Sequence, residues 1–269
     1  MLAIIDSDSI VYASAGAAQH RNEETGQMEY EPVSHACNNA KKTFMKILER
    51  TKCTDYVAYM TGAKDESSFR KNLFPAYKEN RKRSQRPKHY QAVRDYLETN
   101  WGCQIVNEIE ADDSVCIEQY QAYKGLFTYD YDYGGFDECI DGIDSPDLMS
   151  VLVGIDKDLD QVPGLHFNYK KDFFYYITPL EGIRNLYKQI LGGDVADNIP
   201  RCKFGWREKK AFALIDQAKT PEDVINVVIR EFETLGMDPN HEIAWRGNLL
   251  YLHRFEGDSF SSENILEDF

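Results

Sequence analysis

Four short acidic motifs, far apart in the chain, constrain its fold more than any other feature of the sequence. At least three of them follow an apolar run or open a helical pattern, which is where an α/β fold gathers its functional groups. If the motifs share one pocket, each pair of charges about 4 Å apart costs roughly 4 kcal/mol at an effective dielectric near 20. A whole fold is stable by only about 5–15 kcal/mol. The pattern therefore predicts a pocket for divalent cations, formed by Asp6-Ser7-Asp8, Glu110-Ala111-Asp112-Asp113, Asp156-Lys157-Asp158 and Asp194-Val195-Ala196-Asp197.

Apolar runs alternate with helical patterns along the first two thirds of the chain. Buried strands are expected at 2–5, 56–60, 103–106 and 151–154, and a β-hairpin at 165–169 and 173–177. Helices are expected at 9–18, 33–51, 87–101 and 112–124, the first of them capped by Ser7 or Asp8. This alternation predicts an α/β fold with a central, mostly parallel twisted sheet flanked by helices. No strand pattern follows Thr178, so we expect an α/β domain at 1–177 and a helical region at 178–269.

Charge is distributed unevenly along the sequence. The whole chain carries a net charge of −14, but the segment from Lys64 to Arg94 has ten basic and three acidic side chains. Aromatic residues interleave these cations, as in surfaces that bind single-stranded nucleic acid through its phosphates and stacked bases. A run of cations is also typical of an ordinary solvated face. We expect a basic segment at about 64–100 that holds a polyanion beside the acidic pocket.

Other features of the composition exclude several classes of protein. No apolar run approaches the ~18 residues of a membrane span, and the N-terminus lacks the pattern of an export signal, so we expect a soluble cytoplasmic protein. The 6 cysteines are scattered without paired metal-ligand spacing, which argues against a zinc site. Residues 125–148 are rich in Asp and Tyr and are expected to form an acidic surface insertion.

Four signatures, taken in order, resemble the 5′→3′ exonuclease and flap endonuclease family, particularly its phage members. They span about residues 2–211, and each is weak alone. In this sequence they read Phe69-Arg70-Lys71 with Pro75-Ala76-Tyr77-Lys78-Glu79-Asn80-Arg81, Glu110-Ala111-Asp112-Asp113, Gly154-Ile155-Asp156-Lys157-Asp158-Leu159-Asp160-Gln161, and Gly193-Asp194-Val195-Ala196-Asp197-Asn198-Ile199-Pro200.

The resemblance implies a site for two Mg²⁺ or Mn²⁺ ions, which prefer oxygen ligands of this kind. The first ion would be held or oriented by Asp6, Glu110, Asp112 and Asp113, and the second by Asp156, Asp158, Asp194 and Asp197. The family also implies a helical arch, in which Lys78 and Arg81 contact the scissile phosphate; with Asp156 they are the expected catalytic residues. Further substrate contacts are expected from Arg70, Lys71, Tyr77, Lys82, Arg83, Lys203, Lys209 and Lys210.

Two departures from the family pattern bear on these expectations. After the second strand the family places another metal-site Asp, whereas this chain reads Thr61-Gly62-Ala63-Lys64, with Asp65 shifted along. The family also has a glycine-rich hairpin that binds duplex phosphates and K⁺. Only Gly205 of that hairpin remains here, which argues against K⁺ binding.

The favoured hypothesis is a Mg²⁺-dependent 5′→3′ nuclease of DNA replication or repair. Its expected substrates are DNA with 5′ ends, flaps or nicks, and the resemblance extends them to RNA–DNA hybrids. The alternatives are a non-catalytic protein that binds DNA ends or branches on the same scaffold, and a PIN-like ribonuclease. Individual acids also have structural interpretations: Asp8 as a helix cap, Asp112 and Asp113 as first-turn residues, and Asp160 as a solvated side chain. Asp194 and Asp197 would share a face if their stretch is helical.

Overall fold

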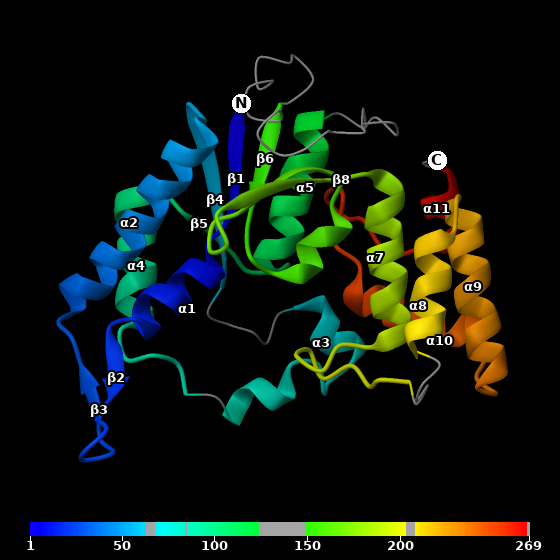
Figure 1. Cartoon of the computed structure of the whole chain (residues 1–269), viewed down its shortest axis with the longest axis horizontal. Coiled ribbons are helices and arrows are strands. Elements are labelled where there is room, and N and C mark those ends of the chain that lie inside the picture. Colours follow the sequence, from blue (N-terminus) through cyan, green and yellow to red (C-terminus); the bar gives the residue numbers. More distant parts are fainter. Residues whose placement is uncertain (63–67, 84, 124–148, 203–207, 268–269) are drawn as a thin grey trace.

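A mixed sheet forms the centre of the protein (Figure 1). The computed structural model describes residues 1–62, 68–83, 85–123, 149–202 and 208–267. The order of the strands is β5-β4-β1-β6-β7-β8, and every neighbouring pair is parallel except β7 and β8. Their bounds are β1 Leu2–Asp6, β4 Asp55–Thr61, β5 Gln104–Val106, β6 Ser150–Val153, β7 Gly164–Asn168 and β8 Phe173–Ile177. The expected α/β fold with a mostly parallel sheet is confirmed.

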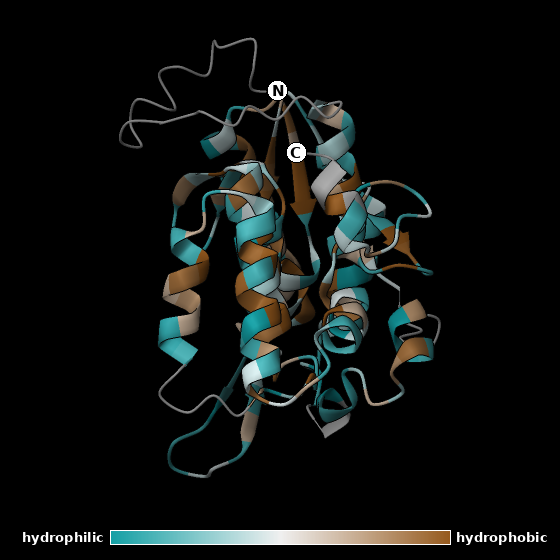
Figure 2. Cartoon of the chain, turned by 90° about the vertical axis from the view of Figure 1, so that its right-hand side faces the viewer, coloured by the Kyte–Doolittle hydropathy of each residue, from teal (hydrophilic) through white to brown (hydrophobic). Residues whose placement is uncertain are grey.

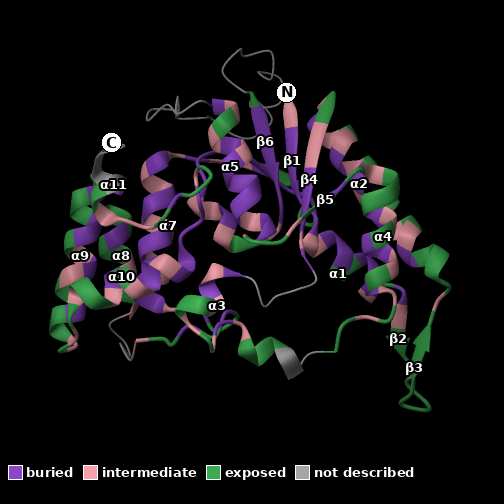
Figure 3. Ribbon diagram, turned by 180° about the vertical axis from the view of Figure 1, so that it is seen from behind, coloured by how far each residue is buried: buried purple, intermediate pink, exposed green. Residues whose placement is uncertain are grey.

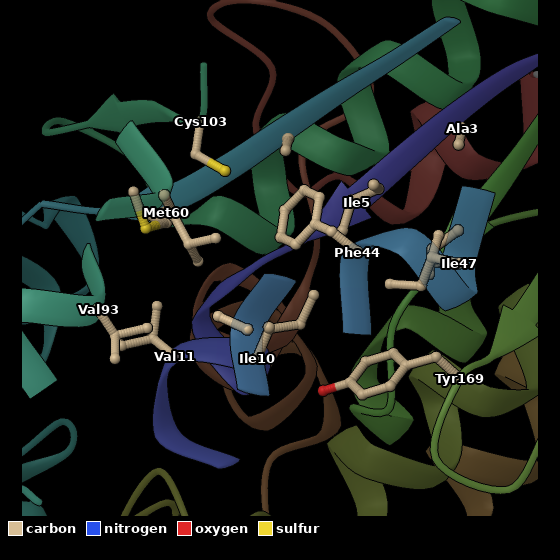
Figure 4. Close-up of a cluster of buried hydrophobic side chains, with 14 of the residues drawn as sticks. Ala3, Ile5, Ile10, Val11, Phe44, Ile47, Met60, Val93, Cys103 and Tyr169 are labelled. Atoms are coloured by element: carbon tan, nitrogen blue, oxygen red, sulfur yellow. The ribbon is translucent and has the colours of Figure 1, made fainter. Parts of the chain in front are cut away.

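Apolar side chains point to both faces of the sheet, which explains why helices cover both faces. In β1, Ala3 and Ile5 enter one hydrophobic cluster and Ile4 enters another, because successive side chains of a strand point to opposite faces. The first cluster is shared with α1 (Asp8–Gly16), α2 (Val33–Thr51) and α4 (Tyr90–Trp101), and Figure 4 shows part of it. The second cluster is shared with α5 (Ala111–Tyr123). The sheet is therefore sandwiched between helices.

The C-terminal third has a hydrophobic core of its own. It consists of the helices α7 (Pro179–Gly192), α8 (Glu208–Gln217), α9 (Pro221–Thr234), α10 (Pro239–Leu250) and α11 (Ser262–Glu267). Three of these helices have N-terminal capping residues. The side chains of Thr178, Thr220 and Asp238 accept hydrogen bonds from first-turn N–H groups, and a proline follows each. Figure 2 shows brown apolar and teal polar residues along these helices. The helical character expected after Thr178 is confirmed, while the division into two domains remains a prediction.

The basic segment divides into a part that crosses the carboxyl edge of the sheet and a part that belongs to the sandwich. The crossing part contains α3 (Phe69–Leu73) and the 3₁₀ helix η1 (Glu79–Arg83), and Figure 1 shows both below the ends of the strands. The later part, α4, packs against α1 and α2 and contributes to the first cluster. Residues 90–100 of the arch expected over 64–100 therefore belong to α4, which packs on the sheet. The expected insertion at 125–148 lies outside the described residues.

A small hairpin and a short 3₁₀ helix complete the described chain. The hairpin, β2 (Gln19–Arg21) with β3 (Met28–Tyr30), is largely exposed, as Figure 3 shows. The 3₁₀ helix η2 (Lys157–Gln161) follows β6. None of the described helices combines the length and the apolar character that crossing a membrane requires.

The buried His166 gives the fold a specific pH dependence. Burial lowers its pKa from 6.5 to about 4, although its hydrogen bond with Val162 O, at 2.7 Å, acts in the opposite direction. Because the pKa of His166 is lower in the folded than in the unfolded state, its contribution to stability is fully present above pH 6.5 and is lost as the pH falls toward 4. The variant His166→Gln keeps a donor for Val162 O but does not titrate. We expect its free energy of unfolding to fall less between pH 7 and pH 4 than that of the wild type, by up to about 3 kcal/mol. Urea unfolding at pH 7, 6, 5 and 4 measures the difference.

His241→Gln is the matched control, because the His241 side chain is 69% exposed and contacts the neighbouring Glu242, so this change should alter the pH profile much less than His166→Gln does. Parallel profiles for the wild type and His166→Gln between pH 7 and 4 would contradict the prediction.

Candidate active site

The carboxyl ends of the parallel strands place acidic residues from distant parts of the chain at one edge of the sheet. Asp6 ends β1, and Asp156 follows β6. Glu110 precedes α5, and Asp112 lies in its first turn. Since parallel strands end at the same edge, the topology alone brings these side chains near one another.

The carboxylates at this edge repel one another. Burial, together with the charges of Asp8 and Asp156, raises the pKa of Asp6 to about 8. Burial likewise raises the pKa of Asp112 well above its usual range, with contributions from Asp6, Asp156 and Glu110. The charges of Asp6, Asp112 and Asp156 therefore act on one another across this edge of the sheet.

A second acidic group adjoins the first through Asp156. Burial, together with the charges of Asp156, Asp194 and Asp197, raises the pKa of Asp158 to about 7. Burial acts the same way on Asp194, but its pKa is nevertheless lowered, chiefly by a hydrogen bond from Lys157. The charge of Asp156 thus acts on both groups of acids that the family resemblance assigns to two metal ions.

Basic side chains lie between the acids. Lys78 Nζ lies 2.6 Å from Glu110 Oε1 and 3.9 Å from Asp197 Oδ2. Arg81 Nη2 lies 2.5 Å from Asp197 Oδ1. Lys78 adopts a left-handed backbone conformation (φ 55°), and its own N–H donates to Asp197 O. These cations offset part of the charge that would otherwise destabilise the edge.

The stretch that contains Asp194 and Asp197 is a turn, so the two residues do not share a helix face. The helix α7 ends at Gly192, and Gly193 has φ 68°, with a Cβ there coming within 2.4 Å of Pro200 O. Asp194 Oδ1 instead accepts from the N–H groups of Ala196 and Asp197. The turn keeps both carboxylates at the site.

Hydrogen bonds fasten this turn to the segment that crosses the edge. Asn198 Nδ2 donates to Ala76 O, and Asn80 Nδ2 donates to Val195 O. Arg81 Nε donates to the carbonyl of Ala196. Chain segments more than 110 residues apart are held side by side by these bonds.

Tyr77 is placed differently from its expected role as a substrate contact. Its side chain is buried, and its hydroxyl lies 3.0 Å from both Glu110 Oε2 and Asp197 Oδ2. A buried ring offers no face for stacking on a base. Tyr77 links one carboxylate of each acidic group.

Arg70 also lies inside the protein, so its predicted contact with substrate is not supported. Its guanidinium is 1% exposed and donates to both oxygens of Asp113, at 2.6 and 2.7 Å. It also donates to Leu249 O in the last turn of α10 and to Tyr251 O directly after that helix. Nη1 lies 3.5 Å from Glu110 Oε2.

Asp113 has no free oxygen for a metal ion. Its Oδ1 also accepts from the N–H of His253, and its Oδ2 from the N–H of Glu110. With Arg70, each oxygen has two donors. Asp113 therefore positions Glu110 from behind the site.

Asp8 is not the helix cap that the sequence suggested. The side chain of Ser7 makes no capping hydrogen bond either. Both carboxylate oxygens of Asp8 accept from Thr61 N, at 3.2 and 3.1 Å, and Oδ1 lies 3.4 Å from Arg94 Nη1. A carboxylate thus stands at the end of β4 although Thr61-Gly62 supplies none there. Sequence reasoning missed this contact, and Arg94, because both depend on residues distant in the chain.

The remaining predicted substrate residues have varied surroundings. Lys209 and Lys210 are exposed in the first turn of α8, and Lys71 is half-buried. Lys82 and Arg83 lie in η1, where the structure describes their backbone but not their side chains. Lys203 lies outside the described residues.

The chemistry of the donor set fits divalent cations with a preference for oxygen. Clustered carboxylates with raised pKa values need positive charge, and hard oxygen ligands suit Mg²⁺ or Mn²⁺. Within the described ranges, no three Asp, Glu, His or Cys side chains are already arranged to hold one ion. Lys78 and Lys157, each of which contacts two of the acids, lie between them instead.

The fold is known from solved structures, although no family model and no curated protein sequence matches the chain. It is similar to a bacteriophage T5 protein co-crystallised with metal ions (TM-score 0.55, 16% identity, covering 100% of this chain and 99% of that one). A variant of the bacteriophage T5 flap endonuclease, in a pseudo-enzyme–product complex with DNA and metal ions, has a TM-score of 0.53, with 16% identity and the same coverage. The T5 5′-exonuclease with bound zinc has a TM-score of 0.51 at 15% identity, covering 99% of this chain and 98% of that one. At this identity the likeness establishes the fold.

The buried pair of Arg70 and Asp113 should be among the strongest local determinants of stability. We expect Asp113→Asn to lower the free energy of unfolding by about 3–5 kcal/mol, because it leaves a buried guanidinium without its counter-charge. The double variant Arg70→Met/Asp113→Asn should lose much less free energy of unfolding than the sum of the losses in Arg70→Met and Asp113→Asn. Urea unfolding of the four proteins measures the coupling.

Lys188→Met is the matched control, since it breaks a partly exposed pair with Asp216 and should cost under about 1 kcal/mol. If Asp113→Asn cost no more than this control, the pair would not have the structural role assigned to it.

Proposed function

We propose that this chain is a metal-dependent, structure-specific 5′→3′ nuclease that hydrolyses phosphodiesters of DNA. The observation that carries the proposal is the convergence of acids from four separate stretches, with basic side chains among them, at one edge of the sheet. The likeness in fold to a flap endonuclease and a 5′-exonuclease supports the same reading.

Two divalent ions, Mg²⁺ or Mn²⁺, would be held by the acidic groups on either side of Asp156. Asp6, Glu110 and Asp112 would serve the first ion, with Asp113 acting through Glu110. Asp156, Asp158, Asp194 and Asp197 would serve the second. When bound, such ions activate water and offset the charge that develops on the phosphodiester.

Basic residues of the chain would place the substrate. Lys78 and Arg81, which already contact Glu110 and Asp197, would bind the scissile phosphate in place of these carboxylates and stabilise its developing charge. Lys209 and Lys210 are exposed in the first turn of α8 and would bind duplex phosphates. DNA with 5′ ends, flaps or nicks fits this arrangement, and RNA–DNA hybrids are a further candidate. A role in replication or repair, and a phage origin, belong to this proposal.

A non-catalytic protein that binds DNA ends or branches is the second candidate. It is favoured by the absence of an acidic residue at Thr61-Gly62, where the sequence pattern of these nucleases places one. Asp8 supplies a carboxylate at that position, but Thr61 N and Arg94 already engage it. Cation-dependent cleavage separates the two candidates.

The decisive assay follows release of a 5′ label from flap and nicked duplexes, with Mg²⁺ and with EDTA. We expect cleavage by the wild type only with Mg²⁺, and none by Asp156→Asn, whose DNA binding should be retained. The side-chain oxygen of Asn can still accept the capping hydrogen bond that Asp156 accepts from the N–H of Asp158. The variant therefore loses the negative charge but keeps the local structure. Binding is measured by fluorescence anisotropy in Ca²⁺.

Asp160→Asn is the matched control from the same 3₁₀ helix, because Asp160 accepts from Tyr175 OH and lies outside the proposed ligand set. It should cleave like the wild type. Wild-type turnover by Asp156→Asn would refute the assignment, and label release unaffected by EDTA would refute the metal dependence.

A further inference from the structure

Lys157 occupies the centre of the second acidic group. Its Nζ lies 2.7 Å from Asp194 Oδ2 and 3.8 Å from Asp158 Oδ1. Lys157 begins η2 directly after Asp156, whose charge also acts on the ammonium. Burial opposes its charge, but the hydrogen bond to Asp194 and the neighbouring acids raise its pKa, which keeps the ammonium protonated.

Asp194 has one oxygen available to a cation, and Lys157 is bound to it. The other oxygen, Oδ1, already accepts from the N–H groups of Ala196 and Asp197. An ion that coordinates Asp194 through Oδ2 therefore competes with the ammonium of Lys157 for the same oxygen.

The acids themselves stay in place without Lys157. Gln189 Nε2 donates to Asp158 Oδ1 at 2.7 Å, and Gln161 Nε2 donates in turn to Gln189 Oε1. Backbone N–H groups fix Asp194, as described above. Departure of the ammonium would leave the carboxylates of this group positioned for another cation.

The two lysines of the site differ in how easily they can leave it. The Lys78 side chain is 12% exposed, lies over the ring of Tyr77, and is anchored through its backbone N–H to Asp197 O. The Lys157 side chain is 63% exposed. Leaving the site costs Lys157 little, because its ammonium can reach solvent without rearrangement of the chain.

We propose that Lys157 is an internal counter-cation that competes with the divalent ion of the second acidic group and so sets the metal concentration at which that group fills. This inference rests on the proposed function, because it assumes that Asp158 and Asp194 receive a metal ion. It adds a specific role for a residue that the nuclease proposal leaves unused.

Binding of Mn²⁺ alone, followed by electron paramagnetic resonance of the free ion, tests the competition without any cleavage assay. Lys157→Met removes the charge and keeps the length of the side chain. We expect it to tighten the weaker class of Mn²⁺ sites about three- to fivefold, which is the effect of losing a half-exposed ion pair. Lys157→Arg should bind Mn²⁺ like the wild type or more weakly, since it retains the charge.

Lys188→Met is again the control, because it removes the same charge from a helix outside the acidic groups. Unchanged or weaker Mn²⁺ binding by Lys157→Met, with two ions bound by the wild type, would overturn this inference alone. Equal tightening in Lys157→Met and Lys188→Met would also overturn it, since the effect would then come from net charge. A wild type that binds no Mn²⁺ would overturn the metal-dependent nuclease and this inference together.

Discussion

Repulsion among carboxylates at the carboxyl edge of the sheet is the constraint to which the rest of the structure responds. The parallel order of β4, β1 and β6 brings Asp6 and Asp156 together, and α5 adds Asp112 from its first turn. Burial and neighbouring charge raise the pKa of Asp6 to about 8, so the acids are costly to keep ionised. Such a cluster persists only with positive charge close by. Lysine and arginine side chains supply part of that charge, and divalent ions would supply the rest.

The supporting structure is built from long-range contacts around this edge. Arg70 joins the base of the crossing segment to Asp113 on α5 and to the carbonyls of Leu249 and Tyr251. His253 completes the arrangement by donating to Asp113 and stacking on Phe69 with ring centroids 4.8 Å apart. The stretch after α10 is therefore part of the active-site framework. Rigid support of this kind is what holds ligands in a productive geometry.

Local pattern predicted the elements better than the partners of individual side chains. The apolar runs located the strands within a residue or two, and the acids that end them came together as expected because parallel strands share an edge. The family resemblance and the basic sequence around them predict substrate contacts for Arg70 and Tyr77, but the acids that they contact inside the protein lie 33 or more residues away. The partners of Asp8, Thr61 and Arg94, are likewise distant in the chain, so local pattern indicates a helix cap instead. The turn at Asp194 did have a local signal, namely Gly192-Gly193, which ends α7.

Thermal unfolding at constant ionic strength, with MgCl₂ replaced stepwise by NaCl, tests the central claim most directly. If the acids form one site that needs divalent charge, Mg²⁺ binds the folded protein alone and stabilises it by about 2.7 kcal/mol at a hundred times its dissociation constant. The melting temperature should then rise by several degrees, at roughly 2–4 °C for each kcal/mol in a chain of this size. A melting temperature that does not change between Na⁺ and Mg²⁺ would contradict the account.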